Sequence, residues 1–120
     1  MPYRVMVVED DEILRWLMVE AVTHLGHEVT EYANADAAVL ALDGAAQLSL
    51  VITDVQMPGH LDGLGLAKAI WSTRPQLPVI IVSGQTVLPP GFLPANARFI
   101  TKPCTLDVLS QTLRELLSSH

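Results

Sequence analysis

The stretch Leu50–Pro58 constrains the fold most, because in it a buried-type strand leads directly into an isolated acid. Four residues suited to a buried strand, Leu50–Thr53, run into Asp54, and a proline follows soon after. A short apolar run bounded by a breaker is typical of a central strand in a parallel sheet. In open α/β sheets the ligand crevice lies at the carboxyl ends of the strands. The pattern therefore predicts that Asp54 lies in a functional crevice.

Strand and helix patterns alternate along the rest of the chain. Five runs are predicted as strands: Arg4–Val8, Glu28–Tyr32, Leu50–Thr53, Pro78–Val82 and Ala97–Thr101. Apolar residues at helical spacing predict a helix after the first, second, third and fifth of these strands. This alternation predicts an α/β fold in which a doubly wound parallel sheet carries helices on both faces.

Capping residues mark where the predicted helices begin and end. Asp11, Asn34 and Thr105 are predicted N-caps of the first, second and last helices, and Gly26 ends the first. The second helix is expected to end at Gly44 and the third to cover 64–72. The buried face predicted for the first helix consists of Ile13, Leu14, Leu17, Met18, Ala21, Val22 and Leu25. The inner face predicted for the last helix consists of Val108, Leu109, Leu113 and Leu116.

The segment Gly84–Asn96 breaks the alternation, because no helix pattern follows the fourth strand. It contains Pro89, Pro90 and Pro94. A proline in a helix interior costs about 3 kcal/mol or more. We therefore expect the helix between the fourth and fifth strands to be shortened or absent.

Composition excludes several classes of protein. The 120 residues suit one domain, and the formal charge of −6 argues against nucleic-acid binding by this domain. No apolar run reaches the roughly 18 residues of a membrane span, and the first residues lack a signal-peptide layout. The single cysteine, Cys104, fits a reducing compartment. We therefore expect one cytoplasmic domain over residues 1–120, with no nucleic-acid or membrane partner.

Polar side chains follow four of the predicted strands. Right-handed crossovers bring the ends of parallel strands to one rim, so Glu9, Asp10, Asp54, Ser83 and Lys102 should meet there. Two carboxylates about 5 Å apart repel by roughly 3 kcal/mol at an effective dielectric of about 20. Such a cluster needs a cation or raised pKa values, and its hard oxygen ligands suit Mg²⁺. With a lysine and a hydroxyl opposite, the rim is a site where Asp54 could accept a phosphoryl group.

At these residues the chain resembles a response-regulator receiver domain of two-component signalling. The matching stretches are Val7–Asp11, Asp54–Pro58 followed by Asp62–Gly63, Val82–Gly84 and Phe99–Pro103. The resemblance implies a flavodoxin-like fold with five parallel strands in the order 2-1-3-4-5. It also implies a phosphoacceptor switch that is not an enzyme beyond catalysing its own phosphorylation and slow dephosphorylation. The expected partners are a histidine kinase or histidine phosphotransfer protein and an unknown downstream protein.

The resemblance assigns roles to single residues. They are the phosphoacceptor Asp54, the phosphate-binding Lys102, the switch residues Ser83 and Phe99, and a Mg²⁺ site of Glu9, Asp10, Asp54 and the backbone carbonyl of Gln56. The Lys102–Pro103 bond is expected to be cis. Gln56 and Gln85 are expected to flank the path of the water that hydrolyses the phosphorylated form.

The chain departs from the family pattern in three places. Three residues, 59–61, separate Pro58 from Asp62, where the commonest pattern has two, so the metal loop is expected to bulge. Cys104 stands where an aromatic residue is common. The third departure is the proline-rich segment after the fourth strand, which makes it unsafe to carry over the family's usual output surface.

Two other functions are alternatives to that of a phosphorylated receiver. A phosphohydrolase of the haloacid-dehalogenase group typically carries two aspartates two positions apart after its first strand, and here the pattern is Glu9-Asp10-Asp11. A receiver-like protein-binding module that works without phosphorylation would be expected to lack an acid, the acceptor or the lysine, and all are present. The chain could be a stand-alone receiver or part of a larger regulator or hybrid kinase.

Overall fold

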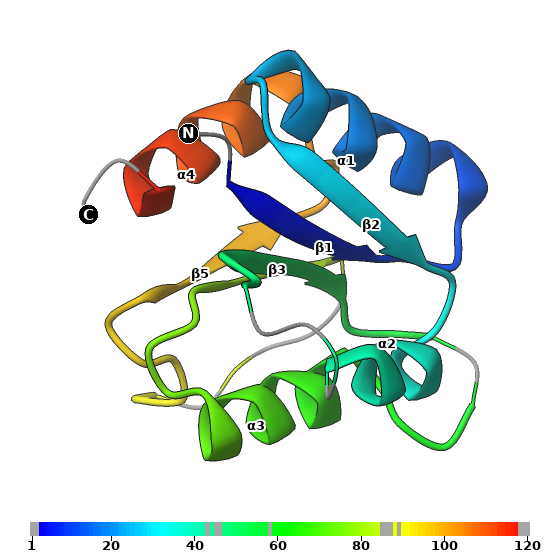
Figure 1. The fold of residues 1–120 in the computed structure, drawn as a ribbon, viewed down its shortest axis with the longest axis vertical. Coiled ribbons are helices and arrows are strands. Elements are labelled where there is room, and N and C mark those ends of the chain that lie inside the picture. Colours follow the sequence, from blue (N-terminus) through cyan, green and yellow to red (C-terminus); the bar gives the residue numbers. More distant parts are fainter. Residues whose placement is uncertain are drawn as a thin grey trace.

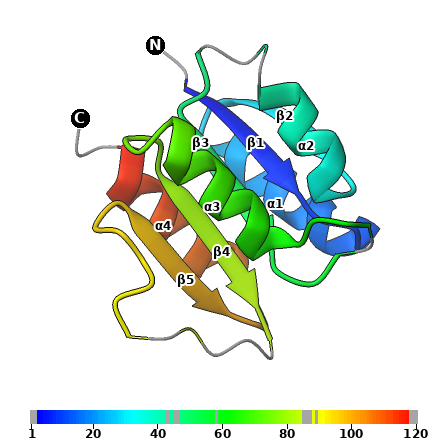
Figure 2. The same cartoon turned by 90° about the horizontal axis from the view of Figure 1, so that it is seen from below.

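A computed structural model gives the structure of this chain and describes residues 3–42, 44, 47–57, 59–84, 88 and 90–117. A five-stranded sheet forms its centre, in the order β2-β1-β3-β4-β5 (Figure 1). The strands are β1 (Arg4–Val8), β2 (Glu28–Tyr32), β3 (Leu50–Asp54), β4 (Val79–Ser83) and β5 (Ala97–Thr101). All neighbouring pairs are parallel, so their carboxyl ends point the same way (Figure 2). The predicted sheet and strand order are confirmed.

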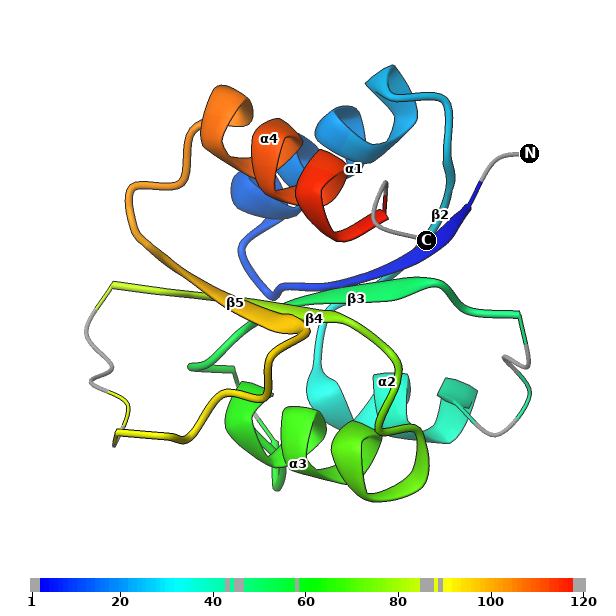
Figure 3. The ribbon, with the colours of Figure 1, turned by 90° about the vertical axis from the view of Figure 1, so that its left-hand side faces the viewer.

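Four helices cover the two faces of the sheet within the described residues. They are α1 (Glu12–His24), α2 (Ala35–Leu42), α3 (Gly63–Thr73) and α4 (Leu106–Leu117). The first and last lie on one face, and the middle two on the other (Figure 3). None of the helices in the described ranges is both long and apolar enough to cross a membrane.

Side chains at the helix ends explain where the helices begin and stop. Asp11 accepts hydrogen bonds from two backbone N–H groups in the first turn of α1, at 2.9 and 3.1 Å. Asn34 accepts one from α2 at 2.8 Å, and Thr105 accepts one from α4 at 3.2 Å. Gly26 follows α1 with a φ of 87°, a conformation that favours glycine. These four predicted caps are confirmed.

The sheet separates two hydrophobic cores. Successive residues of a strand point to opposite faces. Val5 and Val7 of β1 therefore pack against α1 and α4, whereas Met6 and Val8 pack against α2 and α3. The strand β2 lies at the edge of the sheet and has no fully buried residue, which suits its polar sequence.

Two residues predicted to be buried are exposed. Ile13 is 80% exposed and Val108 is 46% exposed. Each lies one residue, or about 100° around the helix, outside the stripe that faces the sheet. In α4 that stripe continues to Leu117, which is 3% exposed and was not predicted.

The connection from β4 to β5 differs from the other crossovers. Its described residues, Gly84, Leu88 and 90–96, form turns and bends and contain no helix. The fourth helix of the chain, α4, instead follows β5. Gln85–Val87 and Pro89 lie outside the described residues.

Phe92, in the described part of this connection, packs against α3. Its ring meets the Trp71 ring edge-on, with centroids 5.6 Å apart, and the Lys68 ammonium lies 5.7 Å from its centroid. Aromatic pairs and cation–π contacts of this kind each stabilise by about 1 kcal/mol. The segment therefore packs on α3, although it forms no helix of its own in the described residues.

Candidate functional site

The register of the sheet brings the predicted site residues to one rim. Val8 and Thr53 form the last register pair of β1 and β3, and the next residues along the chain are Glu9 and Asp54. At the other end of the rim, the backbone N–H of Lys102 donates to the carbonyl of Ser83 at 3.0 Å. Parallel pairing thus places residues from four strand ends beside one another.

A cavity of about 330 Å³ opens at this rim. Six predicted site residues line it: Glu9, Asp10, Asp54, Gln56, Ser83 and Lys102. Phe99 does not line it; the half-buried ring packs toward the core between the sheet and α2 and α3. The structure therefore brings together every predicted site residue except the aromatic one.

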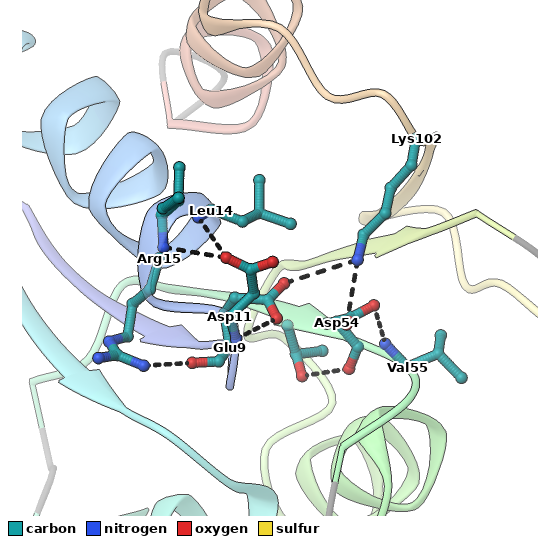
Figure 4. Close-up of polar contacts among 9 residues, drawn as sticks. Glu9, Asp11, Leu14, Arg15, Asp54, Val55 and Lys102 are labelled. Atoms are coloured by element: carbon teal, nitrogen blue, oxygen red, sulfur yellow. Dashed lines mark hydrogen bonds and ion pairs between the residues drawn. The ribbon is translucent and has the colours of Figure 1, made fainter.

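Asp54 is held firmly at the floor of this cavity. It is 4% exposed, and its Oδ1 accepts a hydrogen bond from the Val55 N–H at 2.7 Å. Its Oδ2 accepts one from Lys102 Nζ at 3.2 Å (Figure 4). A backbone group orients one oxygen of this carboxylate, while the other faces the ammonium group of Lys102, which follows β5.

Glu9 is a buried acid beside Asp54. It is fully buried, and its Oε2 accepts a hydrogen bond from the Asp11 N–H at 3.0 Å. Burial raises the pKa of Glu9 to about 7; the Asp11 N–H opposes this rise, and the nearby Asp54 charge adds to it. Its Oε1 has no hydrogen-bond partner among the described residues, and Lys102 Nζ lies 3.9 Å from it.

The acids fit a hard cation. Glu9, Asp10 and Asp54 each offer a carboxylate oxygen, and these oxygens lie within 4.8 Å of one another. An oxygen-only donor set is what hard divalent cations prefer. The buried oxygen of Glu9 without a hydrogen bond is costly unless a cation or a proton satisfies it. The residues present therefore fit a divalent cation at this rim.

Arg15 is a site residue that the sequence analysis missed. Its Nη1 donates to the Glu9 carbonyl at 2.8 Å (Figure 4). Its Nε donates to Glu31 Oε1 at 3.0 Å. It thereby ties α1 to the end of β1 and to β2. A cation this close to the start of a helix is unfavourable for the helix dipole, and that oddity was the available signal.

Three further expectations concern the part of the rim that follows β4 and β5. Ser83 is 2% exposed and lies at the end of β4, as predicted. The Lys102–Pro103 peptide bond is cis, as the resemblance implied. Gln85, expected near the path of hydrolytic water, lies outside the described residues.

Two known regulatory proteins are similar to this chain over most of its length. C4-dicarboxylate transport transcriptional regulatory protein DctD of Rhizobium meliloti is 34% identical over 113 residues, which are 92% of this chain and 24% of DctD. Response regulator receiver protein CpdR of Brucella abortus is 29% identical over 117 residues, which are 95% of this chain and 96% of CpdR. The chain thus spans a minor part of DctD and nearly all of CpdR.

Solved structures agree with this likeness. Response regulator protein TrrA of Thermotoga maritima, solved in complex with Mg(2+)-BeF, matches with a TM-score of 0.83 and 25% identity, covering 96% of this chain and 99% of that one. The receiver domain of the hybrid histidine kinase CckA matches with a TM-score of 0.78 and 29% identity, covering 95% and 98%. The family model of the response regulator receiver domain matches residues 5–114. The chain therefore belongs to the response regulator receiver domain family and has the fold of a two-component phosphoacceptor switch.

Proposed function

We propose that residues 1–120 form a single receiver domain in which Asp54 accepts the phosphoryl group. The observation that carries the proposal is the surroundings of Asp54. This buried carboxylate has the Lys102 ammonium 3.2 Å from one oxygen and two further acids beside it. Acceptor, cation and acid cluster are the groups that phosphoryl transfer to a carboxylate requires.

The proposed donor is a phosphohistidine on a histidine kinase or a histidine phosphotransfer protein. A carboxylate oxygen of Asp54 attacks the phosphorus and forms the new O–P bond. The N–P bond breaks, and the histidine leaves with the electron pair of that bond. Lys102 and the hydroxyl of Ser83 bind oxygens of the transferred group. The domain thus catalyses its own phosphorylation and, more slowly, its dephosphorylation.

Mg²⁺ is the proposed metal. Glu9, Asp10, Asp54 and the backbone carbonyl of Gln56 would hold it. The Oε1 of Glu9, which has no hydrogen-bond partner among the described residues, supports this assignment. When bound, the ion neutralises negative charge that develops on the phosphoryl oxygens.

The proposed switch links Asp54 to the ends of β4 and β5. Ser83 and Lys102 lie in the same cavity, and a backbone hydrogen bond of 3.0 Å joins them. Binding of both side chains to phosphoryl oxygens would shift the equilibrium between two conformations of this region. The neighbouring Phe99 is half-buried and would follow this change by altering its rotamer. The downstream protein would recognise this conformational change.

The proposed docking face for the phosphohistidine protein is the start of α1. Ile13 is 80% exposed and Trp16 is 61% exposed, and α1 begins immediately after the acidic rim. Large apolar side chains at such positions suit a partner surface. The net charge of −6 disfavours nucleic acid as a partner of this domain, and a cytoplasmic location fits the proposed partners.

Intact-mass measurement after incubation with a small-molecule phosphodonor tests the proposal. We expect a single phosphoryl adduct that requires Mg²⁺ and is absent from Asp54→Asn, which keeps the size and shape of the side chain. Asp107→Asn removes an acid from α4, outside the cavity, and should leave the adduct unchanged. An adduct on Asp54→Asn would place the acceptor elsewhere. No adduct on a native protein that binds Mg²⁺ would favour the phosphorylation-independent binding module.

A further inference from the structure

We propose that Asp36 in α2 is a positioning residue for the metal site, acting through the loop that joins β3 to α3. The inference rests on the proposed function and deepens it. Asp36 does not line the cavity at the rim. It contacts the loop that carries Gln56, whose backbone carbonyl is a proposed metal ligand.

The base of this loop is closed by contacts at its two ends. The N–H of Gly63 donates to the carbonyl of Val55 at 2.8 Å. Asp62 caps α3 by accepting a hydrogen bond from the Gly65 N–H at 2.8 Å. These contacts fix where the loop leaves β3 and where it enters α3, but they do not reach its outer part.

Asp36 holds the outer part of the loop. Its Oδ2 accepts a hydrogen bond from the His60 N–H at 3.0 Å, across 24 residues of sequence. The preceding residue, Gly59, has a φ of +109°, and a Cβ built on it would lie 2.3 Å from the same oxygen. Two successive loop residues therefore lie directly against one carboxylate. The positive φ favours glycine at position 59, and a larger residue there would also displace the Asp36 carboxylate.

The sequence of the loop explains why such an anchor matters. Residues 59–61 make it one residue longer than the commonest pattern of the family. Each additional free residue adds backbone conformational entropy, which is lost when the loop must be ordered to bind a metal. Mg²⁺ requires near-ideal octahedral geometry, so a carbonyl ligand on a loosely held loop binds it poorly. An acid on a neighbouring helix that orders the loop in advance removes this cost from metal binding.

Three variants separate the hydrogen bond from the charge. Asp36→Ala removes both and should weaken Mg²⁺ binding about tenfold, in line with other residues that orient metal ligands. Asp36→Asn removes the charge but keeps an oxygen that can accept the His60 N–H, so it should retain most of the affinity. Gly59→Ala keeps the acid in the sequence, but its added methyl group must push the Asp36 carboxylate and the loop apart, so it should resemble Asp36→Ala.

Asp107 offers a matched control. It is the second residue of α4, as Asp36 is the second residue of α2, and both follow a capping side chain. Asp107→Ala therefore removes a similar favourable interaction with a helix dipole, but no loop contact. It should leave the Mg²⁺ affinity unchanged.

Two measurements on the folded variants decide the proposal. Calorimetric titration with MgCl₂ gives the affinity, and NMR hydrogen exchange of the His60 amide without metal reports the anchor itself. We expect slowed exchange in the wild type and Asp36→Asn, and faster exchange in Asp36→Ala. Wild-type affinity in Asp36→Ala would overturn the positioning role while leaving the proposed function intact, and so would equal losses in the alanine and asparagine variants. A wild type that binds no Mg²⁺ would overturn both.

Discussion

At the scale of single residues, Glu9 is the most unusual group of the site. It is fully buried beside Asp54, and its pKa is raised to about 7. Near neutral pH, a proton and a cation therefore compete for the same buried oxygen. Because metal ligands must be deprotonated, binding of a cation here should release a proton, and its affinity should rise with pH through this range.

The raised pKa of Glu9 predicts how stability depends on pH in metal-free buffer. The pKa rises from 4.5 to about 7, so between these values the folded protein binds more protons than the unfolded chain. The stability from this group is complete below the unfolded pKa and is lost as the pH rises through 7. The expected loss is up to about 3 kcal/mol. Urea unfolding at pH 5 and pH 8 measures it.

Glu9→Gln is the control for this prediction, because glutamine stays neutral at both pH values. The stability of the variant relative to the wild type should increase from pH 5 to pH 8. If both proteins change by the same amount, the slope belongs to other groups and the buried acid is not its source.

At the scale of elements, the first residue of α3 lies very close to the last residue of β3. A Cβ on Gly63 would lie 1.7 Å from the backbone oxygen of Asp54. The helix can therefore start directly against the strand end only because position 63 lacks a side chain. This close approach keeps the loop short at its base and sets the position of Asp54 relative to α3.

Gly63→Ala should therefore destabilise the protein and disturb Asp54. The added methyl group must push the backbone apart, and overpacking of this kind costs about 1–3 kcal/mol or more. Gly44→Ala is the matched control, because a Cβ there meets no atom within 4 Å. Urea unfolding should show a clear loss for the first variant and little change for the second. Equal effects would mean that the close approach is not the constraint.

At the scale of the whole molecule, the sheet divides the interior into two cores. Ile52 and Ile80 are register partners in the core beneath α1 and α4. Ile70 of α3 lies in the other core. A substitution in one core should therefore have little effect on the packing of the other core.

Double-mutant cycles with Ile→Val substitutions test this separation. Each single change should cost about 0.5–1.5 kcal/mol. The costs of Ile52→Val and Ile70→Val should add to within about 0.5 kcal/mol, because the two residues belong to separate cores on opposite faces of the sheet. The costs of Ile52→Val and Ile80→Val should depart from additivity by more than that. Equal coupling in both pairs would show that the sheet transmits packing changes between the cores.

Much of the fold and of the candidate site could be predicted because the signals are local. Strands follow from short apolar runs, and helix starts follow from capping side chains such as Asp11 and Asn34. Once the strands are parallel, their carboxyl ends share a rim, so Glu9, Asp54 and Lys102 are expected at the same edge of the sheet. The family model of the receiver domain matches residues 5–114, a range that includes all three.

The contacts between elements could not be read in this way. Ile13 and Val108 sit one position off the buried stripe, and only packing against the sheet decides which side of a helix is covered. Arg15 reaches Glu31, and Asp36 reaches His60, through the placement of separate elements, which no local pattern encodes. The helices and strands and the chemistry of the rim are therefore specified by residue types along the chain, because they depend on neighbouring residues and on strand ends. The side chains that hold the rim in place are set by the packing of separate elements, and they become visible only in the folded molecule.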